Sequence, residues 1–436
     1  MKNSKHAIKA ISLLWIGSLL GAGCAFLTQV ILARQLGPAE FGAFVTAFAI
    51  VTLVMPLAGF GISQYWLKAF GQEGWGAIRF LAPSFRFVGM STVAVVMALM
   101  AWAVFGPHEK SQTIMMAVLS FYLIGQVAVE LVSSKLQLEE RYVRLALWQF
   151  FPHFIRFLVV IIMAFWLTDW VSGENIAYAY AFAAIGFALL GSRPLFRMFR
   201  GYFDLKGHGN EPVLAPELVQ PSIKTVIANS WPFGMAGLFH LIYFQSAIIL
   251  IKYITGEAAA GVYNVAFTIM VAVLLFPSIV YQKFLLPKMH RWANHDRERF
   301  YQVYRQGNII MLILGIVAML LIWAIAPWGV PFVFGAAYQD AVSLLTVMAI
   351  STPILFVASS VGATLVTQEH MKKKVQYMGA VAVVNIVLNM ALIPRFGALG
   401  AAIATVLSNA VLLVIFYVAA QNKVFNSKGN GNVAIN

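Results

Sequence analysis

Long apolar stretches separated by short polar segments run along almost the whole chain. Each is about as long as the roughly 20 residues that a helix needs to cross the hydrocarbon core of a membrane. Helices are expected because lipid offers backbone groups no hydrogen bonds. The pattern predicts an all-α integral membrane protein with about twelve transmembrane helices. The predicted spans are Ala10–Leu32, Phe41–Gln64, Phe87–Phe105, Thr113–Ser133, Ala146–Leu167, Asn175–Leu195, Val226–Ile251, Val262–Leu286, Asn308–Trp328, Ala341–Val366, Val375–Ile393 and Leu399–Ala419.

The composition supports this interpretation. Of 436 residues, 61% are hydrophobic and 11% are charged, whereas a soluble domain is about half apolar and a quarter charged. The single cysteine, Cys24, excludes a disulfide scaffold. The formal net charge is +14, but the basic residues lie between the apolar stretches rather than in one patch, so we expect no nucleic-acid partner.

The distribution of lysine and arginine predicts the orientation. If the N-terminus is cytoplasmic, 25 of the 30 basic residues fall in cytoplasmic segments. The outer segments then hold only Arg34, Lys110, Lys252 and Arg395. Both termini are therefore predicted to be cytoplasmic. The motif ending at Cys24 resembles a lipoprotein cleavage site, but apolar character continues to Leu32, which favours an uncleaved first helix.

A short pattern occurs twice, in the same order and at the same spacing. Gly37–Ile50 and Gly256–Ile269 share glycine, glycine, an aromatic residue, alanine, phenylalanine and isoleucine, 219 residues apart. Because that offset contains six spans, both copies have the same orientation, which predicts two parallel six-helix bundles with the ligand cavity between them. We expect the bundles at residues 1–196 and 226–436, joined by a Pro- and Gly-rich cytoplasmic linker at 197–225.

One arginine falls inside a predicted span. Arg156 shares a helix face with Gln149 and His153, and a charge at this depth is costly unless it meets a partner or a wet cavity. Two interpretations are open. Arg156 lines a cavity and binds an anionic phosphate, with Gln149 and His153 beside it, or it forms a structural bridge with Glu130 of the preceding span.

For the other polar residues within spans or at their ends, the sequence leaves two possible roles open. Glu130 either carries a coupling proton or sodium ion or reaches the interface, and His240 either contacts substrate or is a hydrogen-bonded neutral histidine. Arg34 and Lys252, at outer helix ends, either draw a phosphate outward or reach the outer headgroups. Asn385 and Asn389, on one face of a later span, join helices or contact substrate. Metal-ligand spacing is absent, and we predict neither a metal nor a cofactor.

Four motifs, in order, resemble the Wzx-type polysaccharide flippases. They are Leu32–Gly42, Gly256–Ala266, Phe334–Ala341 and Asn389–Ala402. The resemblance implies the MATE-like exporter fold of the MOP superfamily, with a central cavity between two bundles. It also implies transfer of an undecaprenyl-pyrophosphate-linked oligosaccharide from the cytoplasmic to the periplasmic leaflet of the bacterial inner membrane, for O-antigen, capsule or exopolysaccharide. Ser246 occupies a place where such proteins often carry aspartate.

The implied partners are the polyprenyl-linked glycan and membrane lipids, together with a polysaccharide polymerase and chain-length proteins. Two other functions are weighed against a flippase. A cation-coupled multidrug exporter on the same scaffold would use buried carboxylates, and only Glu130 is available. A membrane enzyme would need a catalytic constellation at the outer surface, where the loops are short and carry isolated acidic residues, so we expect no enzymatic activity.

Overall fold

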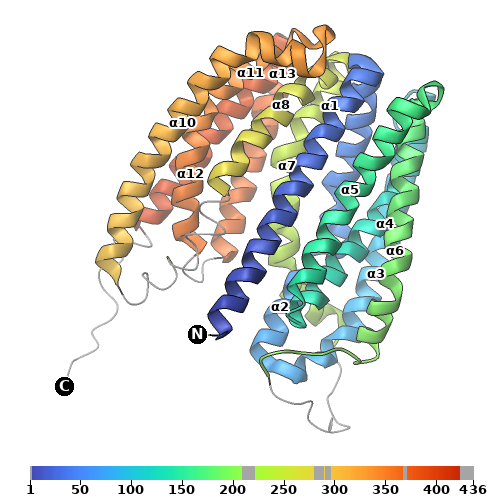
Figure 1. Cartoon of the computed structure of the whole chain (residues 1–436), viewed down its shortest axis with the longest axis vertical. Coiled ribbons are helices and arrows are strands. Elements are labelled where there is room, and N and C mark those ends of the chain that lie inside the picture. Colours follow the sequence, from blue (N-terminus) through green and yellow to red (C-terminus); the bar gives the residue numbers. More distant parts are fainter. Residues whose placement is uncertain (1, 209–220, 279–288, 290–295, 367–370, 423–436) are drawn as a thin grey trace. The chain divides into compact units, whose positions relative to one another are not determined.

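The computed structural model describes residues 2–208, 221–278, 289, 296–366 and 371–422, and these form helices without a strand (Figure 1). The chain divides into two compact units, Met1–Gln245 and Ser246–Asn436. The boundary falls inside α7 (Ile223–Thr255), so this helix contributes to both units. The bundles predicted at 1–196 and 226–436 were defined by the sequence repeat, whereas the two units are defined by how compactly the chain packs. The predicted bundle boundaries therefore stay a prediction.

The first unit is built from long helices and short connections. Its most extensive packing pairs α4 with α6 and α1 with α5. Connections as short as these are expected between antiparallel membrane helices. Its elements are α1 (Lys2–Gly59), α2 (Ile62–Glu73), the 3-10 helix η1 (Gly74–Phe80), α3 (Leu81–Phe105), α4 (Lys110–Leu138), α5 (Tyr142–Trp166), the 3-10 helix η2 (Thr168–Trp170), α6 (Gly173–Phe199) and the first part of α7.

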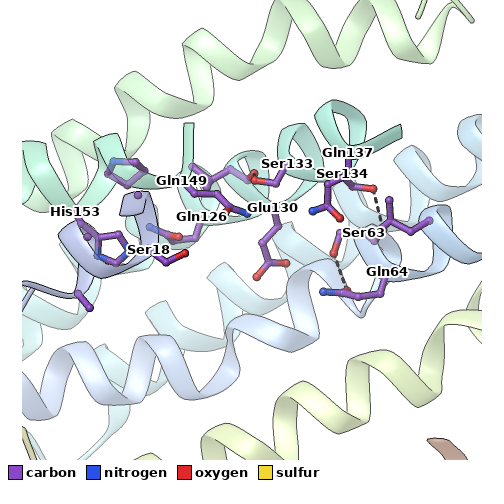
Figure 2. A pocket seen from close by; sticks show the side chains of 16 residues that line it. Ser18, Ser63, Gln64, Gln126, Glu130, Ser133, Ser134, Gln137, Gln149 and His153 are labelled. Carbon is purple, nitrogen blue, oxygen red and sulfur yellow. Dashed lines mark hydrogen bonds between the residues drawn. The ribbon is translucent and has the colours of Figure 1, made fainter. Parts of the chain in front are cut away.

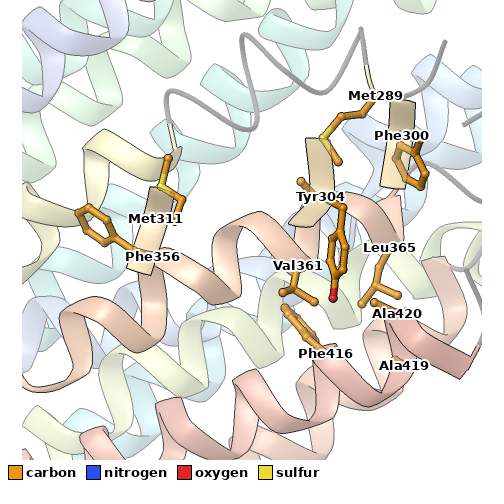
Figure 3. Packing of buried hydrophobic residues seen from close by; sticks show 11 residues of the cluster. Met289, Phe300, Tyr304, Met311, Phe356, Val361, Leu365, Phe416, Ala419 and Ala420 are labelled. Carbon is orange, nitrogen blue, oxygen red and sulfur yellow. The ribbon is translucent and has the colours of Figure 1, made fainter. Parts of the chain in front are cut away.

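The second unit packs α10 against α12 and α12 against α13. Aromatic and aliphatic side chains from these helices, including Phe300, Tyr304, Phe356 and Phe416, form a buried core (Figure 3). Its elements after α7 are α8 (Glu257–Ser278), α10 (Arg297–Phe334), the 3-10 helix η4 (Ala336–Tyr338), α11 (Ala341–Ala349), α12 (Ser351–Val366) and α13 (Met371–Ala420).

The predicted all-helical membrane protein is confirmed. In the described part of the chain, eight helices are long and apolar enough to span a membrane, or up to nine if α11 and α12, bent by 44°, form one broken span. The sequence predicts about twelve because the single candidate span Leu14–Phe105 covers three of the predicted stretches and α13 covers two. The helices of α1 and of α13 are merged across kinks at Gly37 and Gly397. The predicted stretch that ends at Leu286 continues past α8 and outside the described residues.

The two copies of the sequence repeat begin with the same backbone feature. Gly37 has φ 72° within α1, and Gly256 has φ 106° between α7 and α8. A positive φ is readily adopted only by glycine. This requirement explains why both copies of the repeat begin with glycine. In each copy this glycine is a non-helical residue between two helical segments.

The aromatic positions of the repeat also adopt the same geometry. Phe44 and Phe48 stack with ring centroids 6.2 Å apart and 10° between planes, and Tyr263 and Phe267 stack at 6.2 Å and 12°. Phe44 and Tyr263 are each buried in their own unit. The recurring residues therefore encode a recurring local structure rather than a general similarity of apolar helices.

Candidate functional site

A polar cavity of about 440 Å³ lies within the first unit, between the first part of α1, α2, α4 and α5 (Figure 2). Ligand pockets generally range from about 300 to 1,000 Å³. The cavity is lined by Gly17, Ser18, Gly21, Ala22, Ser63, Gln64, Leu67, Gln126, Val129, Glu130, Ser133, Ser134, Gln137, Gln149, Pro152 and His153. Three residues predicted from the sequence, Glu130, Gln149 and His153, are therefore brought together in one place.

Glu130 supplies the carboxylate of this lining, and its side chain is exposed to the cavity. Across the described residues it forms no ion pair and no hydrogen bond. A methyl group added at Gly59 would lie 3.6 Å from Glu130 Oε2, so the carboxylate also approaches the end of α1. The predicted structural bridge between Arg156 and Glu130 is not formed.

Arg156 is held by neutral partners instead. Its Nε donates to the Pro152 carbonyl oxygen (3.1 Å), and its Nη1 donates to Tyr122 Oη (3.1 Å). Its Nη2 lies 2.9 Å from His153 Nδ1. The guanidinium carbon lies 5.6 Å from the ring centroids of both Tyr122 and Tyr180, within cation–π range. The ring faces and hydrogen bonds together stabilise a positive charge near the middle of α5.

This arrangement fixes the state of His153. A guanidinium has only donors, so His153 Nδ1 accepts and the neutral ring carries its proton on Nε2. Arg156 is absent from the cavity lining itself. Arg156 is linked to two residues of the lining. It bonds directly to His153, and it shares Tyr122 Oη with Gln126, whose Nε2 donates to that oxygen at 2.6 Å. Arg156 therefore lies directly behind the cavity wall, and three of its five N–H groups are used.

The other predicted residues lie away from this cavity lining. Arg34 is exposed on α1 shortly before the kink. On α7, His240 is exposed, with its ring centroid 4.6 Å from that of Phe244. Lys252 lies near the end of α7, with its Nζ 4.6 Å from the Tyr253 ring centroid.

Several cavity residues were missed in the sequence, although one signal was present. Gln126, Glu130, Ser134 and Gln137 follow one another on α4 at spacings of four, four and three. Residues at this spacing share one helix face. A polar stripe inside an otherwise apolar span thus indicates a cavity. No such pattern in the sequence marks Gln64 of α2 as a lining residue.

Asn385 and Asn389 join helix segments of the second unit. Ser246 Oγ donates to Asn385 Oδ1 (3.0 Å), and Asn385 Nδ2 donates to Ser408 Oγ (3.1 Å). Asn389 Nδ2 donates to the Asn385 carbonyl oxygen at 2.8 Å. Because all four side chains are buried, this network links α7 with both parts of α13, which favours the helix-joining alternative.

Comparison with solved structures identifies the fold. The chain aligns with lipid II flippase MurJ in an inward closed conformation at a TM-score of 0.72 and 13% identity, covering 94% of this chain and 87% of the other. It aligns with an inward-facing multidrug resistance MATE family transporter of the MOP superfamily at 0.67 and 15%, covering 95% and 98%. A MOP superfamily transporter from Pyrococcus furiosus gives 0.66 and 16%, covering 95% of each chain. The protein therefore has the fold that these MOP superfamily structures share, as the sequence resemblance implied.

The family follows from sequence. The chain belongs to the polysaccharide biosynthesis protein family, whose sequence model matches residues 7–293. It is also 22% identical over 349 residues to the succinoglycan biosynthesis transport protein ExoT of Rhizobium meliloti (strain 1021). That match covers 76% of this chain and 63% of the relative, so the chain spans less than two thirds of that relative's length.

Proposed function

We propose that the protein is a flippase that moves an undecaprenyl-pyrophosphate-linked oligosaccharide from the cytoplasmic to the periplasmic leaflet of the bacterial inner membrane. The product would supply O-antigen, capsule or exopolysaccharide synthesis. Membership of the polysaccharide biosynthesis family supports this proposal. The likeness to a lipid II flippase fold is consistent with it.

The observation that carries the proposal is the environment of Arg156. A charged side chain at the centre of a membrane helix costs about 2.5–3.5 kcal/mol on insertion scales. Arg156 lies near the middle of the 25-residue α5 and has no acidic partner in the described part of the chain. Its two remaining N–H groups can donate to two oxygens of a phosphate group, an interaction that guanidinium groups form readily.

The proposed mechanism is alternating access of the two units. The pyrophosphate and sugar enter from the cytoplasmic side while the prenyl chain stays in lipid. Arg156 offsets the phosphate charge, and the Nε2–H of His153 and the amide of Gln149 serve sugar hydroxyl groups. Arg34, Lys252 and His240 are proposed contacts on the path to the exit.

Substitution of Arg156 tests the proposal. We expect Arg156→Ala to abolish glycan export and to leave glycan-lipid in the cytoplasmic leaflet, whereas Arg156→Lys retains part of the activity because it keeps the charge. Arg144→Ala is the matched control, since Arg144 is exposed near the start of the same helix. Each variant is compared at equal amounts of folded protein in the membrane. Normal surface glycan with Arg156→Ala would refute the proposal.

A cation-coupled multidrug exporter is the second candidate, and Glu130 on the cavity is the observation that favours it. A cationic drug could pair with this carboxylate. Deletion of the gene would then sensitise cells to cationic drugs without accumulation of glycan-lipid. The flippase proposal expects accumulation of glycan-lipid without a change in drug sensitivity.

The remaining assignments follow from the flippase proposal. Both termini are cytoplasmic. A polysaccharide polymerase and chain-length proteins would act on the exported glycan. We assign no catalytic residue and no cofactor, because transport changes the position of the substrate and no bond in it.

A further inference from the structure

The end of α6 carries three arginines on one face. Arg193, Arg197 and Arg200 follow one another at spacings of four and three, which places them on the same side of the helix. All three are exposed. Across the described residues, their side chains form no ion pair and no hydrogen bond. Positive charge without an acidic partner in the described chain therefore extends over about 10 Å of this helix end.

Two general causes of positive charge at a helix end do not account for this row of arginines. The helix dipole favours cations at the C-terminus, but its effect fades within the last turn. Arg193 lies more than one turn before Phe199, the last residue of α6. The positive-inside bias concerns how many basic residues a segment contains, and it does not require them to share one side of a helix. The arrangement therefore favours a ligand with negative charge.

Toward the middle of α6, the same face is apolar and strongly exposed. Phe182 and Leu189 are 82% and 69% exposed. They precede Arg193 at spacings of seven and four, so they share its side of the helix. The ring of Phe196, also exposed, lies within the arginine row. A face that is apolar along the span and cationic at its end matches a phospholipid, whose acyl chains and phosphate follow in the same order.

The opposite side of α6 holds this helix end in place. Met198 is fully buried, and Leu195 packs against the buried cluster that includes Leu145 of α5. The Phe199 ring lies edge-on to Phe85 of α3, with the ring centroids 5.6 Å apart. Because the backbone is fixed before a ligand arrives, binding requires ordering of the arginine side chains alone, which limits its entropic cost.

From this face we infer a binding site for one anionic phospholipid. Arg193, Arg197 and Arg200 hold its phosphate, since guanidinium groups donate in pairs to phosphate oxygens. Its acyl chains lie along Phe182 and Leu189. The site is separate from the cavity, whose lining contains none of these residues, and it goes beyond the proposed function. Under the proposed topology, the lipid belongs to the cytoplasmic leaflet.

Lipid-dependent stability of the purified full-length chain tests the site. The unfolding temperature is measured in detergent at fixed pH and ionic strength, with added phosphatidylglycerol, phosphatidylcholine of the same acyl chains, or inorganic phosphate. We expect phosphatidylglycerol to raise the unfolding temperature in a saturable way, and the other two to leave it unchanged. Equal rises with both lipids would overturn the inference, because phosphatidylcholine carries no net charge. An equal rise with inorganic phosphate would also overturn it, because the site would then bind a free anion.

Variants then locate the effect. An arginine close to an anionic headgroup strengthens binding about fivefold. The triple variant Arg193→Gln, Arg197→Gln and Arg200→Gln should therefore need roughly 100-fold more phosphatidylglycerol for the same rise. The matched control removes three exposed cations from other helices, namely Lys68→Gln of α2, Arg144→Gln of α5 and Lys224→Gln of α7. It should respond as the wild type does. A wild-type response in the arginine variant, or an equal loss in the control, would overturn the inference.

Chemical modification of the wild-type chain provides a test that does not depend on folding of the variants. Phenylglyoxal modifies accessible arginines, and mass spectrometry locates each product. In nanodiscs of phosphatidylglycerol, Arg193, Arg197 and Arg200 should react more slowly relative to Arg144 than in nanodiscs of phosphatidylcholine. The same relative rates in both lipids would reject the site. These assays contain no glycan, so their failure leaves the proposed flippase function untouched.

Discussion

The turn between α1 and α2 packs against α7 so closely that one added methyl group should disturb the first unit. Gly61, in this turn, has φ 71°. A Cβ built on it would lie 2.5 Å from the Phe233 Cβ atom and 2.8 Å from the Phe233 carbonyl carbon. From the opposite side, a Cβ on Gly234 would lie 2.9 Å from the carbonyl carbon of Phe60. Since backbone atoms take part on both sides, a change of rotamer cannot relieve the overlap.

Two costs add for Gly61→Ala. The left-handed backbone costs a non-glycine residue about 1–2 kcal/mol. Overpacking of a filled interior costs about 1–3 kcal/mol more. The expected loss of stability is therefore about 2–5 kcal/mol. Gly201→Ala separates the two costs. Gly201 follows α6 with φ 83° and no atom within 4 Å of its built Cβ, and the bond from the Tyr202 N–H to the Arg197 carbonyl oxygen (2.9 Å) is typical of a left-handed glycine at a helix end.

The assay is thermal unfolding of the purified variants in detergent, followed by tryptophan fluorescence. We expect Gly201→Ala to lower the unfolding temperature moderately and Gly61→Ala to lower it clearly further. Gly71→Ala, in α2 with open space around its Cβ, should unfold at or slightly above the wild-type temperature, because alanine is favoured over glycine within a helix. Equal unfolding temperatures for the Gly61 and Gly201 variants would refute the close packing of α7 on this turn.

Three further outcomes can be measured. Tyr263→Phe removes the hydrogen bond to Thr405 (3.1 Å) and should lower stability by about 1 kcal/mol in thermal unfolding; no change would show that water replaces the bond. Glu139→Gln leaves Lys135 and Arg141 without their buried carboxylate and should cost about 1.5–3 kcal/mol. Because Glu139 Oε1 also accepts from the Asp204 N–H (3.3 Å) in the segment after α6, that segment should be cleaved faster by protease, and wild-type cleavage rates would exclude a role of Glu139 in anchoring it. With the single native cysteine replaced by serine, Glu109→Cys should react with an impermeant maleimide in intact cells and His208→Cys only after permeabilisation; the reverse result would invert the proposed topology.

Local sequence was sufficient for the helices and for the repeat. Apolar length alone predicts the spans, because the membrane imposes a helix on any long apolar segment. Gly37 and Gly256 were recognisable as equivalent because each requires a backbone that other residues avoid, and this requirement acts at a single position. The resemblance to a transporter family was likewise readable from short motifs at the helix ends.

The site was only partly readable. The sequence placed Gln149, His153 and Arg156 on one face, and Glu130 in the neighbouring span. It left open whether Arg156 pairs with Glu130 or meets a cavity. That choice depends on the rotation of α4 against α5 and on how far each side chain reaches, and a hydrophobic pattern specifies neither.

The sequence by itself thus determined that this chain crosses the membrane repeatedly, that its two repeat segments share a local structure, and that one arginine is placed at depth. Only the tertiary structure decided that Tyr122 and Tyr180 hold this arginine behind the cavity wall, and that Glu130 faces the cavity with no hydrogen-bond or ion-pair partner among the described residues. The physical reason is that span formation depends on transfer of each segment from water to lipid. The partners of a buried charge depend instead on which helices, distant in sequence, pack around it.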